Sequence, residues 1–517
     1  MIPDEPRPWR RNRCVPAPQN YLNKVLSFLD LRYRGPTRVP RRGNVSMIGE
    51  HAVVTGAGMA GLLAARAASE FYRSVTIVER DVLPDSPVHR KGVPQGRHLH
   101  SVLSRGVSVL DMLFPGLVDE LGAAGAVVVD DPDLSRVYAR VGAHELSQSG
   151  TLADPAALRF YLASRPFTEF HVRRRVQALD NVTFLDGHDV AGPVIQGDAI
   201  TGLRMIDCAN RTESVLDCDL VIDAAGRASR TPLLLESLGY GRPAEQTDSS
   251  DWAYSSQLMT LTEPGFPERM AMANNGSRRP RALLLAQEHD HWMLAIARAA
   301  ETGPPPSDFA GMLATAGDML PARIIAGLRR AEPVGEVATV RKTQAVWRRY
   351  DLMPRFPAGL LVTGDALCSL NPLYGQGMTM ATLDALAMRE CLRAGPSRLR
   401  ERYFAATARH LSSTWALNQT NDRIPPPAIA RPKAAERLQK WMRLAAIEAA
   451  GSDIRVTEQL LRVNGLIDPP ARLRHPALVS RILIGKIRMC SRGTDRRTTS
   501  LVSRIVASRN PRPHVAG

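Results

Sequence analysis

Short apolar runs and longer helix-like segments alternate through the first half of the chain. Ala52–Val54 and Val75–Val78 are short and apolar, and Leu62–Ser69 between them is rich in Ala and Leu. Short continuous apolar runs are typical of buried parallel strands, and an Ala/Leu-rich segment is typical of a helix. The pattern predicts strand, helix and strand in one βαβ unit.

Later segments predict both helices and antiparallel strands. Arg281–Ala286 and Trp292–Ala299 alternate around a polar stretch, which predicts a hairpin. Pro166 is read as a local interruption of the helix over Ala156–Gln177. Further strands are expected within residues 182–222 and at Ser255–Thr262, and further helices at Ser101–Leu113, Gly377–Glu390, 396–417, Pro432–Ala449, Asp453–Val463, Leu478–Met489 and Leu501–Ser508.

The turn after the first strand carries the glycine pattern of a dinucleotide site. Gly56, Gly58 and Gly61 follow GxGxxG spacing, with Met59 and Ala60 at the expected helix start. The first glycine allows the tight turn, the second lets a pyrophosphate approach, and the third lets the helix pack closely. Glu79 ends the second strand, where an acid binds ribose hydroxyls. The set predicts a bound dinucleotide at the helix N-terminus.

A second informative stretch runs from Gly359 to Met378. An apolar strand ends at Gly364-Asp365, a loop rich in Pro and Gly follows, and a helix begins near Gly377. Asp365 is therefore expected at the carboxyl end of a strand, where α/β folds bind ligands. The helix N-terminus would place partial positive charge against a reduced flavin. The alternative is a plain loop before a capped helix.

Charge is concentrated at the two ends of the chain. Of the net charge of +16, +7 lies in residues 1–46 and +8 in residues 481–517, so the middle is nearly neutral. Such tails do not by themselves make a surface that reads nucleic acid. The terminal segments predict a basic, disordered extension or a contact with a lipid surface. For the last helices the two alternatives are a solvated, charged helix and a helix that lies on a lipid surface.

Cysteine and histidine usage gives no sign of a metal. The six cysteines are scattered without a CxxC pair, which fits a reducing cytoplasm, with peripheral membrane contact as an alternative. His98 and His100 have no evident third ligand and are read as a helix N-cap or as flavin neighbours. No run of about 18 apolar residues predicts a membrane span.

The glycine-rich turn, the acid at Glu79 and the stretch from Gly359 to Met378 together resemble the FAD-dependent monooxygenases that include squalene epoxidase and the aromatic hydroxylases. Within that group, Glu79-Arg80-Asp81, His89–Gln95, Ser164-Arg165-Pro166 and the run from Gly364 to Met378 are most similar to bacterial epoxidases of polyether biosynthesis. The resemblance implies an α/β fold: a Rossmann-like FAD-binding domain of the glutathione-reductase type, an inserted antiparallel-sheet substrate domain and C-terminal helices.

The implied domains and cofactor contacts follow from this resemblance. The FAD-binding domain is expected at 47–230 and 346–395, with part of the substrate wall near 120–160, the substrate domain at 231–345, and a helical region with a basic tail at 396–517. No catalytic side chain and no metal ligand is assigned. The expected FAD contacts are Gly56, Gly58, Met59, Ala60, Gly61, Glu79, Arg80, Arg97, Arg165, Gly364, Asp365, Pro372, Gly375, Gly377 and Met378.

The implied reaction inserts one oxygen atom of O2 into a small lipophilic substrate through a flavin C4a-hydroperoxide. Epoxidation of a polyene or polyketide in secondary metabolism is favoured, with NAD(P)H as electron donor, directly or through a partner reductase. The alternatives are an aromatic hydroxylase, a flavin-dependent reductase of an isoprenoid-like substrate, and a non-catalytic protein that uses its basic tails. The Trp-x-Trp-x-Ile-Pro pattern of halogenases is absent. The oligomeric state stays open.

Overall fold

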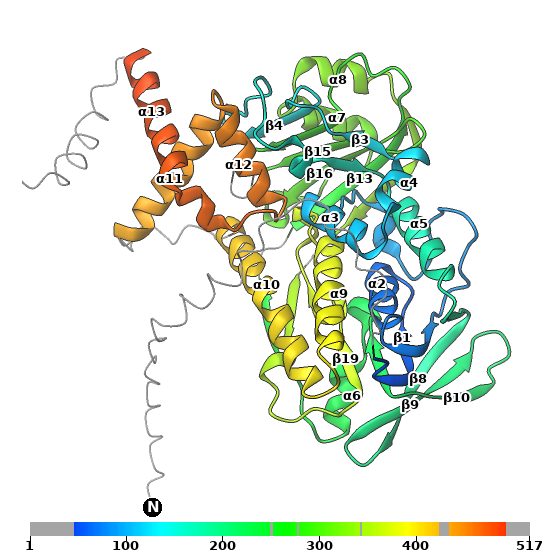
Figure 1. The fold of residues 1–517 in the computed structure, drawn as a ribbon. Coiled ribbons are helices and arrows are strands. Elements are labelled where there is room, and N and C mark those ends of the chain that lie inside the picture. Colours follow the sequence, from blue (N-terminus) through cyan, green and yellow to red (C-terminus); the bar gives the residue numbers. More distant parts are fainter. Residues whose placement is uncertain (1–45, 249–251, 277–278, 342–343, 423–433, 493–517) are drawn as a thin grey trace, which may run out of the picture. The chain divides into compact units, whose positions relative to one another are not determined.

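The computed structural model describes residues 46–248, 252–276, 279–341, 344–422 and 434–492 (Figure 1). Two predictions lie outside the described residues: the basic extension before Ser46 and the last helix at 501–508.

A five-stranded parallel sheet contains the predicted βαβ unit. Strands β1 (Gly49–Thr55) and β2 (Tyr72–Val78) are parallel neighbours, and α2 (Met59–Ala68) connects them. Both strands begin before their apolar runs, because the preceding residues, among them His51 and Ser74, still pair through the backbone. The strand order is β19-β11-β1-β2-β7, completed by β19 (Leu360–Val362), β11 (Leu220–Asp223) and β7 (Val182–Leu185).

One long helix lies along α2, a second packs on the first, and both join the hydrophobic core of α2. Helix α9 (Gly377–Arg393) is next to α2 in Figure 1, and α10 (Leu399–Asp422) packs against α9. Leu62, Leu63 and Met388 have no exposed surface in this core. Helix α3 (Ser104–Leu113) also packs on α9. Residues more than 300 positions apart thus position the glycine-rich turn of the first βαβ unit.

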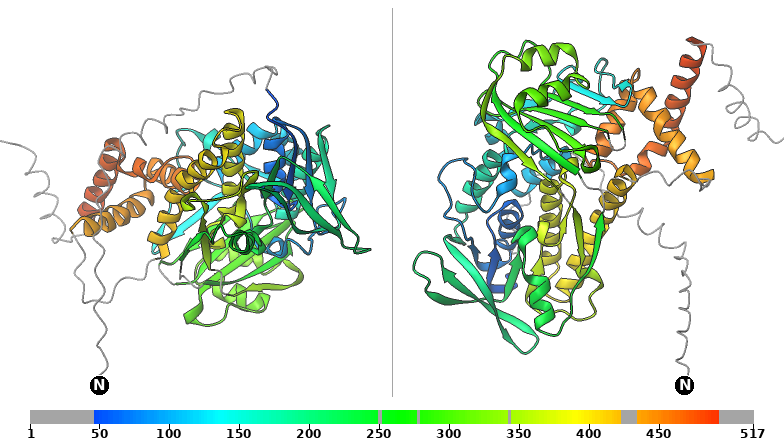
Figure 2. Two further views of the ribbon diagram at one scale, coloured as in Figure 1. Left: turned by 90° about the horizontal axis from the view of Figure 1, so that it is seen from below. Right: turned by 180° about the vertical axis from the view of Figure 1, so that it is seen from behind.

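A seven-stranded sheet forms the second large layer. Its order is β17-β13-β16-β15-β14-β4-β5, antiparallel except for the parallel pair β14–β4. Helices α7 (Phe309–Gly317) and α8 (Ala322–Leu328) pack on one face through Leu284, Leu294 and Ile296 (Figure 2). The strands are β17 (Glu332–Val340), β13 (Trp252–Thr260), β16 (His291–Ala299), β15 (Arg281–Ala286), β14 (Met270–Asn274), β4 (Val137–Val141) and β5 (His144–Glu145).

The predicted hairpin is confirmed, and β13 begins before the predicted strand. Strands β15 and β16 are paired antiparallel neighbours, with Leu283 opposite Ala295. Strands β4 and β5 enter the same sheet from a segment more than 100 residues earlier. Their contribution explains why the sheet is wider than the alternating runs after residue 231 suggest.

The prediction of one helix over Ala156–Gln177 is wrong in its first part. That part forms a 3-10 turn, η2 (Pro155–Leu158), and strand β6 (Phe160–Leu162), which pairs with β3 (Val127–Val129). Helix α5 (Arg165–Gln177) begins immediately before Pro166. Proline lacks an N–H and its fixed φ suits the first turn, so Pro166 starts this helix and does not interrupt it.

Smaller sheets and the C-terminal helices complete the described chain. Among the described residues, no helix has the length and apolar character needed to cross a membrane. The remaining elements are β8 (His188–Gln196), β9 (Ala199–Asp207) and β10 (Glu213–Asp217) in one sheet, β12 (Ala244–Asp248), β18 (Ala345–Arg349) and β20 (Cys368–Ser369) in another, and helices α4 (Leu117–Ala123), α6 (Thr231–Ser237), α11 (Ala434–Ala450), α12 (Ile454–Asn464) and α13 (Pro476–Arg492).

Candidate active site

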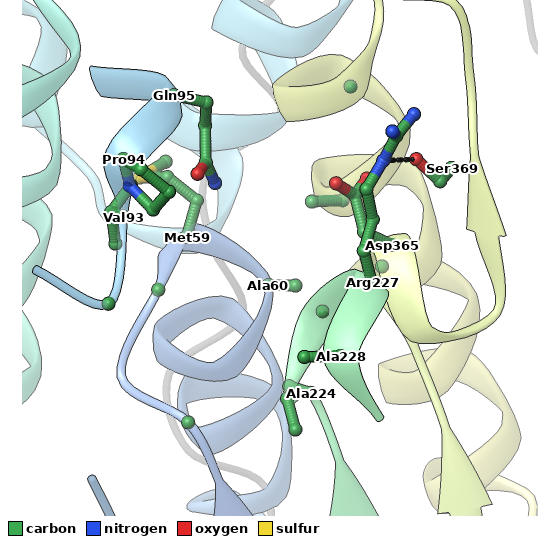
Figure 3. Close-up of a pocket in the computed structure, with 18 of the residues that line it drawn as sticks. Met59, Ala60, Val93, Pro94, Gln95, Ala224, Arg227, Ala228, Asp365 and Ser369 are labelled. Carbon is green, nitrogen blue, oxygen red and sulfur yellow. Dashed lines mark hydrogen bonds between the residues drawn. The ribbon is translucent and has the colours of Figure 1, made fainter. Parts of the chain in front are cut away.

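A cavity of about 1440 Å³ opens at the carboxyl ends of β1, β2, β11 and β19 and reaches the seven-stranded sheet. A pocket for one drug-sized ligand has roughly 300–1000 Å³. The cavity is therefore large enough for a dinucleotide and a second small molecule. Figure 3 shows its middle, with Met59 and Gln95 on one side and Asp365 and Arg227 on the other.

The structure brings all but one of the predicted cofactor residues to this cavity. Gly61 is the exception, because it lies behind the glycine-rich turn. The residues that line the cavity are Gly56, Gly58, Met59, Ala60, Glu79, Arg80, Arg97, Arg165, Gly364, Asp365, Pro372, Gly375, Gly377 and Met378. Their contact with FAD stays a prediction.

Two glycines let the turns approach each other. A Cβ on Gly61 would lie 1.8 Å from the carbonyl oxygen of Gly56, so only glycine fits this packing position. Gly364 has φ +60°, and a Cβ there would lie 2.4 Å from Cβ of Ala60. The Gly364-Asp365 turn is thus pressed against the first turn of α2. Both predicted motifs converge on one place.

The surroundings of Gly58 fit a pyrophosphate. A Cβ on Gly58 would meet only the tips of two arginines, Arg165 Nη2 at 3.8 Å and Arg90 Nη2 at 4.0 Å. Within the described chain, Arg90 Nη2 and Arg165 Nε are buried without a hydrogen-bond partner. Gly58 is also the N-cap of α2 without a side-chain cap, so free N–H groups face the same space. The two arginine side chains and the free N–H groups at the N-terminus of α2 can therefore bind an anion at this position.

Arg90 was not among the predicted contacts, although it anchors the basic loop, residues His89–His100. Its pKa is raised by Glu169 and Glu79 against the opposing effect of burial. Arg165 shares Glu169 at 3.2 Å. His98 and His100 in this loop suggested a flavin neighbour, but no local pattern indicated which of its cations would face Gly58. Arg90 contacts three carboxylates: Glu169 at 2.9 Å, Asp81 at 3.1 Å and Glu79 at 3.2 Å.

Glu79 is buried at the end of β2, where the ribose acid was expected. Its Oε2 accepts the N–H of Ala57 at 2.7 Å and its Oε1 accepts the N–H of Asp81 at 3.0 Å. A carboxylate has about four acceptor positions. Glu79 therefore helps to shape the turn and keeps acceptor capacity toward the cavity.

Asp365 lies across the cavity from the basic cluster. Burial raises the pKa of its carboxyl group, while Arg227 and Arg165 oppose this rise. Its side chain has no hydrogen-bond partner among the described residues. Next to it Arg227, a residue that the sequence did not single out, donates from Nε to Ser369 Oγ (Figure 3). Asp365 is thus a free acceptor for ligand hydroxyl or N–H groups.

The helix after the second motif also points its N-terminus at the cavity. Gly377 and Met378 line it, and Gln376, the N-cap of α9, makes no side-chain cap. From the middle of α9, Asp384 accepts the N–H of Gly364 at 3.2 Å and pairs with His410 Nε2 at 2.7 Å. This buried carboxylate holds the Asp365 turn against α9.

The seven-stranded sheet supplies the opposite wall of the cavity. Register places Ala338, Ser256, Ala295 and Leu283 in one row across β17, β13, β16 and β15. All four line the cavity, on the sheet face away from α7 and α8. Tyr254 stands in the next row on the same face. Among the described residues, no sheet position that lines the cavity carries a charged side chain.

His98 and His100 line this cavity, and their interpretation as a helix N-cap is wrong. The N-caps beside them are Val93 and Leu103, because His98 follows the 3-10 turn η1 (Pro94–Arg97) in extended conformation. Burial lowers the pKa of His98 to about 4 and that of His100 to about 3. Within the described residues, no group of three or more His, Cys, Asp or Glu could hold a metal ion.

Known proteins were compared with the chain on sequence and structure. Protein Rv3254 of Mycobacterium tuberculosis is 35% identical over 465 residues, covering 86% of this chain and 96% of its own length. Kynurenine 3-monooxygenase of Salinispora arenicola is 28% identical, covering 80% of this chain and 91% of its own length. The solved p-nitrophenol 4-monooxygenase PnpA of Pseudomonas putida DLL-E4 has TM-score 0.57 at 16% identity, over 82% of this chain and 99% of that one. No protein-family model matches the chain.

The fold and the cavity, with these relatives, define an FAD-dependent monooxygenase built on a Rossmann-like domain with an inserted sheet. Within that class, the chain belongs to the family of Protein Rv3254. FAD is its cofactor, and it acts on a small molecule and O2. The predicted fold class and enzyme class are confirmed. The narrower resemblance to epoxidases is not supported by these relatives.

Proposed function

We propose that this enzyme hydroxylates an aromatic substrate held against the seven-stranded sheet. The observation that carries the proposal is the two-sided cavity, with buried cations and free helix N-termini on one side and a neutral, mostly apolar wall on the other. A flat surface with Ala338 and Ala295 in one row and Ala297 in the next suits a planar ring. The relative named for kynurenine 3-hydroxylation supports an arene over an alkene.

The chain's own residues divide the work of cofactor binding. Arg90, Arg165 and the N–H groups that begin α2 would hold the pyrophosphate, and Glu79 the ribose. Asp365 and the N-terminus of α9 would face the isoalloxazine and ribityl groups. FAD, when bound, supplies the redox chemistry that activates O2 with electrons from NAD(P)H, the donor typical of the class.

The wall contributes by excluding water and orienting the substrate. Leu283, Val337 and Val340 offer no hydrogen bonds to solvent molecules. An apolar surrounding strengthens the polar interactions that remain inside the closed site. A lipophilic substrate fits this wall, and contact of the basic terminal segments with a membrane would bring such a substrate near.

Labelled oxygen tests the proposal directly. FAD-loaded protein, NADPH and ¹⁸O2 are incubated with 2-naphthol, 4-nitrophenol, kynurenine or a linear polyene, and the products are read by mass spectrometry. We expect ¹⁸O in a hydroxylated arene. Label found only in an epoxide or its diol would reject aromatic hydroxylation in favour of epoxidation. Anaerobic reduction of the polyene without label would instead indicate a reductase.

A further inference from the structure

Three polar side chains meet at the centre of the apolar wall. His98 Nδ1 is 3.1 Å from Ser256 Oγ, and the His98 ring meets the Tyr254 ring edge to face at a centroid distance of 4.9 Å. His98 and Ser256 are 7% and 1% exposed. All three residues line the cavity. His98 comes from the basic loop, and Tyr254 and Ser256 come from β13.

The hydrogen bond to Ser256 leaves one ring atom of His98 facing the cavity. Within the described chain His98 Nε2 has no hydrogen-bond partner, and the backbone N–H of His98 is used by Gln95 O. Burial keeps the imidazole neutral at physiological pH, because its pKa is lowered to about 4. A neutral imidazole presents either one N–H or one lone pair at Nε2, depending on its tautomer. A hydroxyl group can satisfy either state, whereas an ether oxygen can only accept and therefore satisfies the N–H state alone.

The surrounding wall decides the charge of the partner. A buried carboxylate or ammonium needs a paired countercharge, and the sheet positions around His98 provide none. Of the arginines that line the cavity outside this wall, Arg90 and Arg165 face Gly58, and Arg97 and Arg227 are exposed. The space beside His98 therefore favours an uncharged group capable of one hydrogen bond.

We propose that His98, oriented by Ser256, binds the neutral phenolic hydroxyl of the substrate and so selects phenols over their ethers and over aromatic carboxylates. The inference rests on the proposed hydroxylase function and names its substrate class. Tyr254 packs against the imidazole and fixes the plane in which Nε2 points. His98 is then a specificity residue that touches substrate, and Ser256 is a positioning residue.

A binding experiment on the oxidised, FAD-loaded protein tests this without turnover. 2-Naphthol, 2-methoxynaphthalene and 2-naphthoate are titrated while the flavin absorbance spectrum is followed. One net hydrogen bond is worth about 0.5–1.5 kcal/mol, so we expect a preference for 2-naphthol over the ether of roughly 2- to 13-fold. The preference should not change between pH 6 and 8, because His98 does not titrate there.

Two variants and a matched control locate the effect. His98→Phe keeps the aromatic contact with Tyr254, and Ser256→Ala removes only the hydroxyl; each should reduce the preference below about 2-fold. Ser255→Ala is the control, because Ser255 is equally buried but bonds to the carbonyl oxygen of Pro306. It should keep the wild-type preference.

The outcomes separate this inference from the hydroxylase proposal. Equal affinity for 2-naphthol and its ether, or tighter binding of 2-naphthoate, overturns the role of His98 even if the enzyme inserts ¹⁸O into arenes. A preserved naphthol preference without ¹⁸O in any arene product supports the phenol site and rejects hydroxylation. An unchanged preference in both His98→Phe and Ser256→Ala also overturns the inference.

Discussion

The two large sheets meet the same cavity with opposite chemistry. The carboxyl ends of the parallel sheet carry glycine turns, helix N-termini and buried arginines. The seven-stranded sheet presents alanines, aliphatic side chains and Ser256, to which the neutral His98 of the basic loop is hydrogen-bonded. Binding a dianionic pyrophosphate requires fixed positive charge, whereas holding a neutral ring requires its absence. The cavity keeps these two requirements on separate elements.

This contrast also separates two kinds of information in the sequence. The cofactor side depends on close backbone approach, which only glycine permits, as at Gly61 and Gly364. The substrate side depends on which strands become neighbours, and that register is set by pairing between distant segments. Four predictions challenge the contrast, beginning with the largest effect.

The largest effect is expected for Gly61→Ala. Its Cβ would lie 1.8 Å from the Gly56 carbonyl oxygen, which is backbone and cannot move without opening the turn. We expect a loss of about 3 kcal/mol or more in the free energy of unfolding, with poor FAD loading. Urea denaturation measures it. Gly317→Ala, at the end of α7 with nothing within 4 Å, is the control and should change stability by less than about 1 kcal/mol.

The neutral state of His98 in the apolar wall should make the stability of the folded protein depend on pH. The pKa of His98 is lowered from 6.5 to about 4 in the folded protein, so the unfolded chain binds the proton more readily. Stability from a neutral His98 is complete above pH 6.5 and is lost as pH falls toward 4. Flavin-free wild type should therefore lose about 3 kcal/mol more than His98→Gln between pH 7.5 and 4. Parallel denaturant-stability curves for the two proteins would contradict it.

Gly58→Val tests the cofactor side while sparing the fold. The built Cβ meets only flexible arginine tips, at 3.8 and 4.0 Å, so the protein should remain folded. The side chain would occupy the pyrophosphate position, and we expect FAD affinity to fall by about 100-fold or more. Absorbance at flavin wavelengths after purification gives the result. A soluble, fully yellow variant would remove Gly58 from the phosphate site.

The smallest effect is expected for Asp365→Asn. The side chain keeps its shape but offers the cavity an amide in place of a carboxyl group, and FAD affinity should fall about tenfold. Fluorescence titration of flavin-free protein measures it. The raised pKa adds a second readout, because a buried acid that prefers its proton weakens the flavin-free fold as pH rises above about 4. The asparagine variant should show a flatter stability curve above that pH.

The fold and most of the cofactor side could be read from the sequence because their signals are local. The GxGxxG turn, the acid after β2 and the Gly364-Asp365 run each combine chemistry and conformation within a few residues. Arg90 could not be distinguished from its neighbours Lys91 and Arg97, because only the folded loop decides which cation faces Gly58. The pairing of His98 with Ser256 joins residues 158 positions apart, and no periodicity records it. Pro166 was misread because a helix-starting proline and a helix-breaking one look alike without the cap beside it.

The N-cap residue of α5 connects this helix to the seven-stranded sheet. Ser164, the N-cap of α5, donates both its backbone N–H and its hydroxyl to Glu288 at the tip of the β15–β16 hairpin, at 2.8 and 2.5 Å. Helix α5, which carries Arg165, thus begins at a residue that is hydrogen-bonded to the seven-stranded sheet. A chimera that exchanges this sheet for that of a relative must therefore also carry an acidic residue at the hairpin tip. Without it, the N-terminus of α5 would lose its contact with the sheet, and Arg165 would be misaligned.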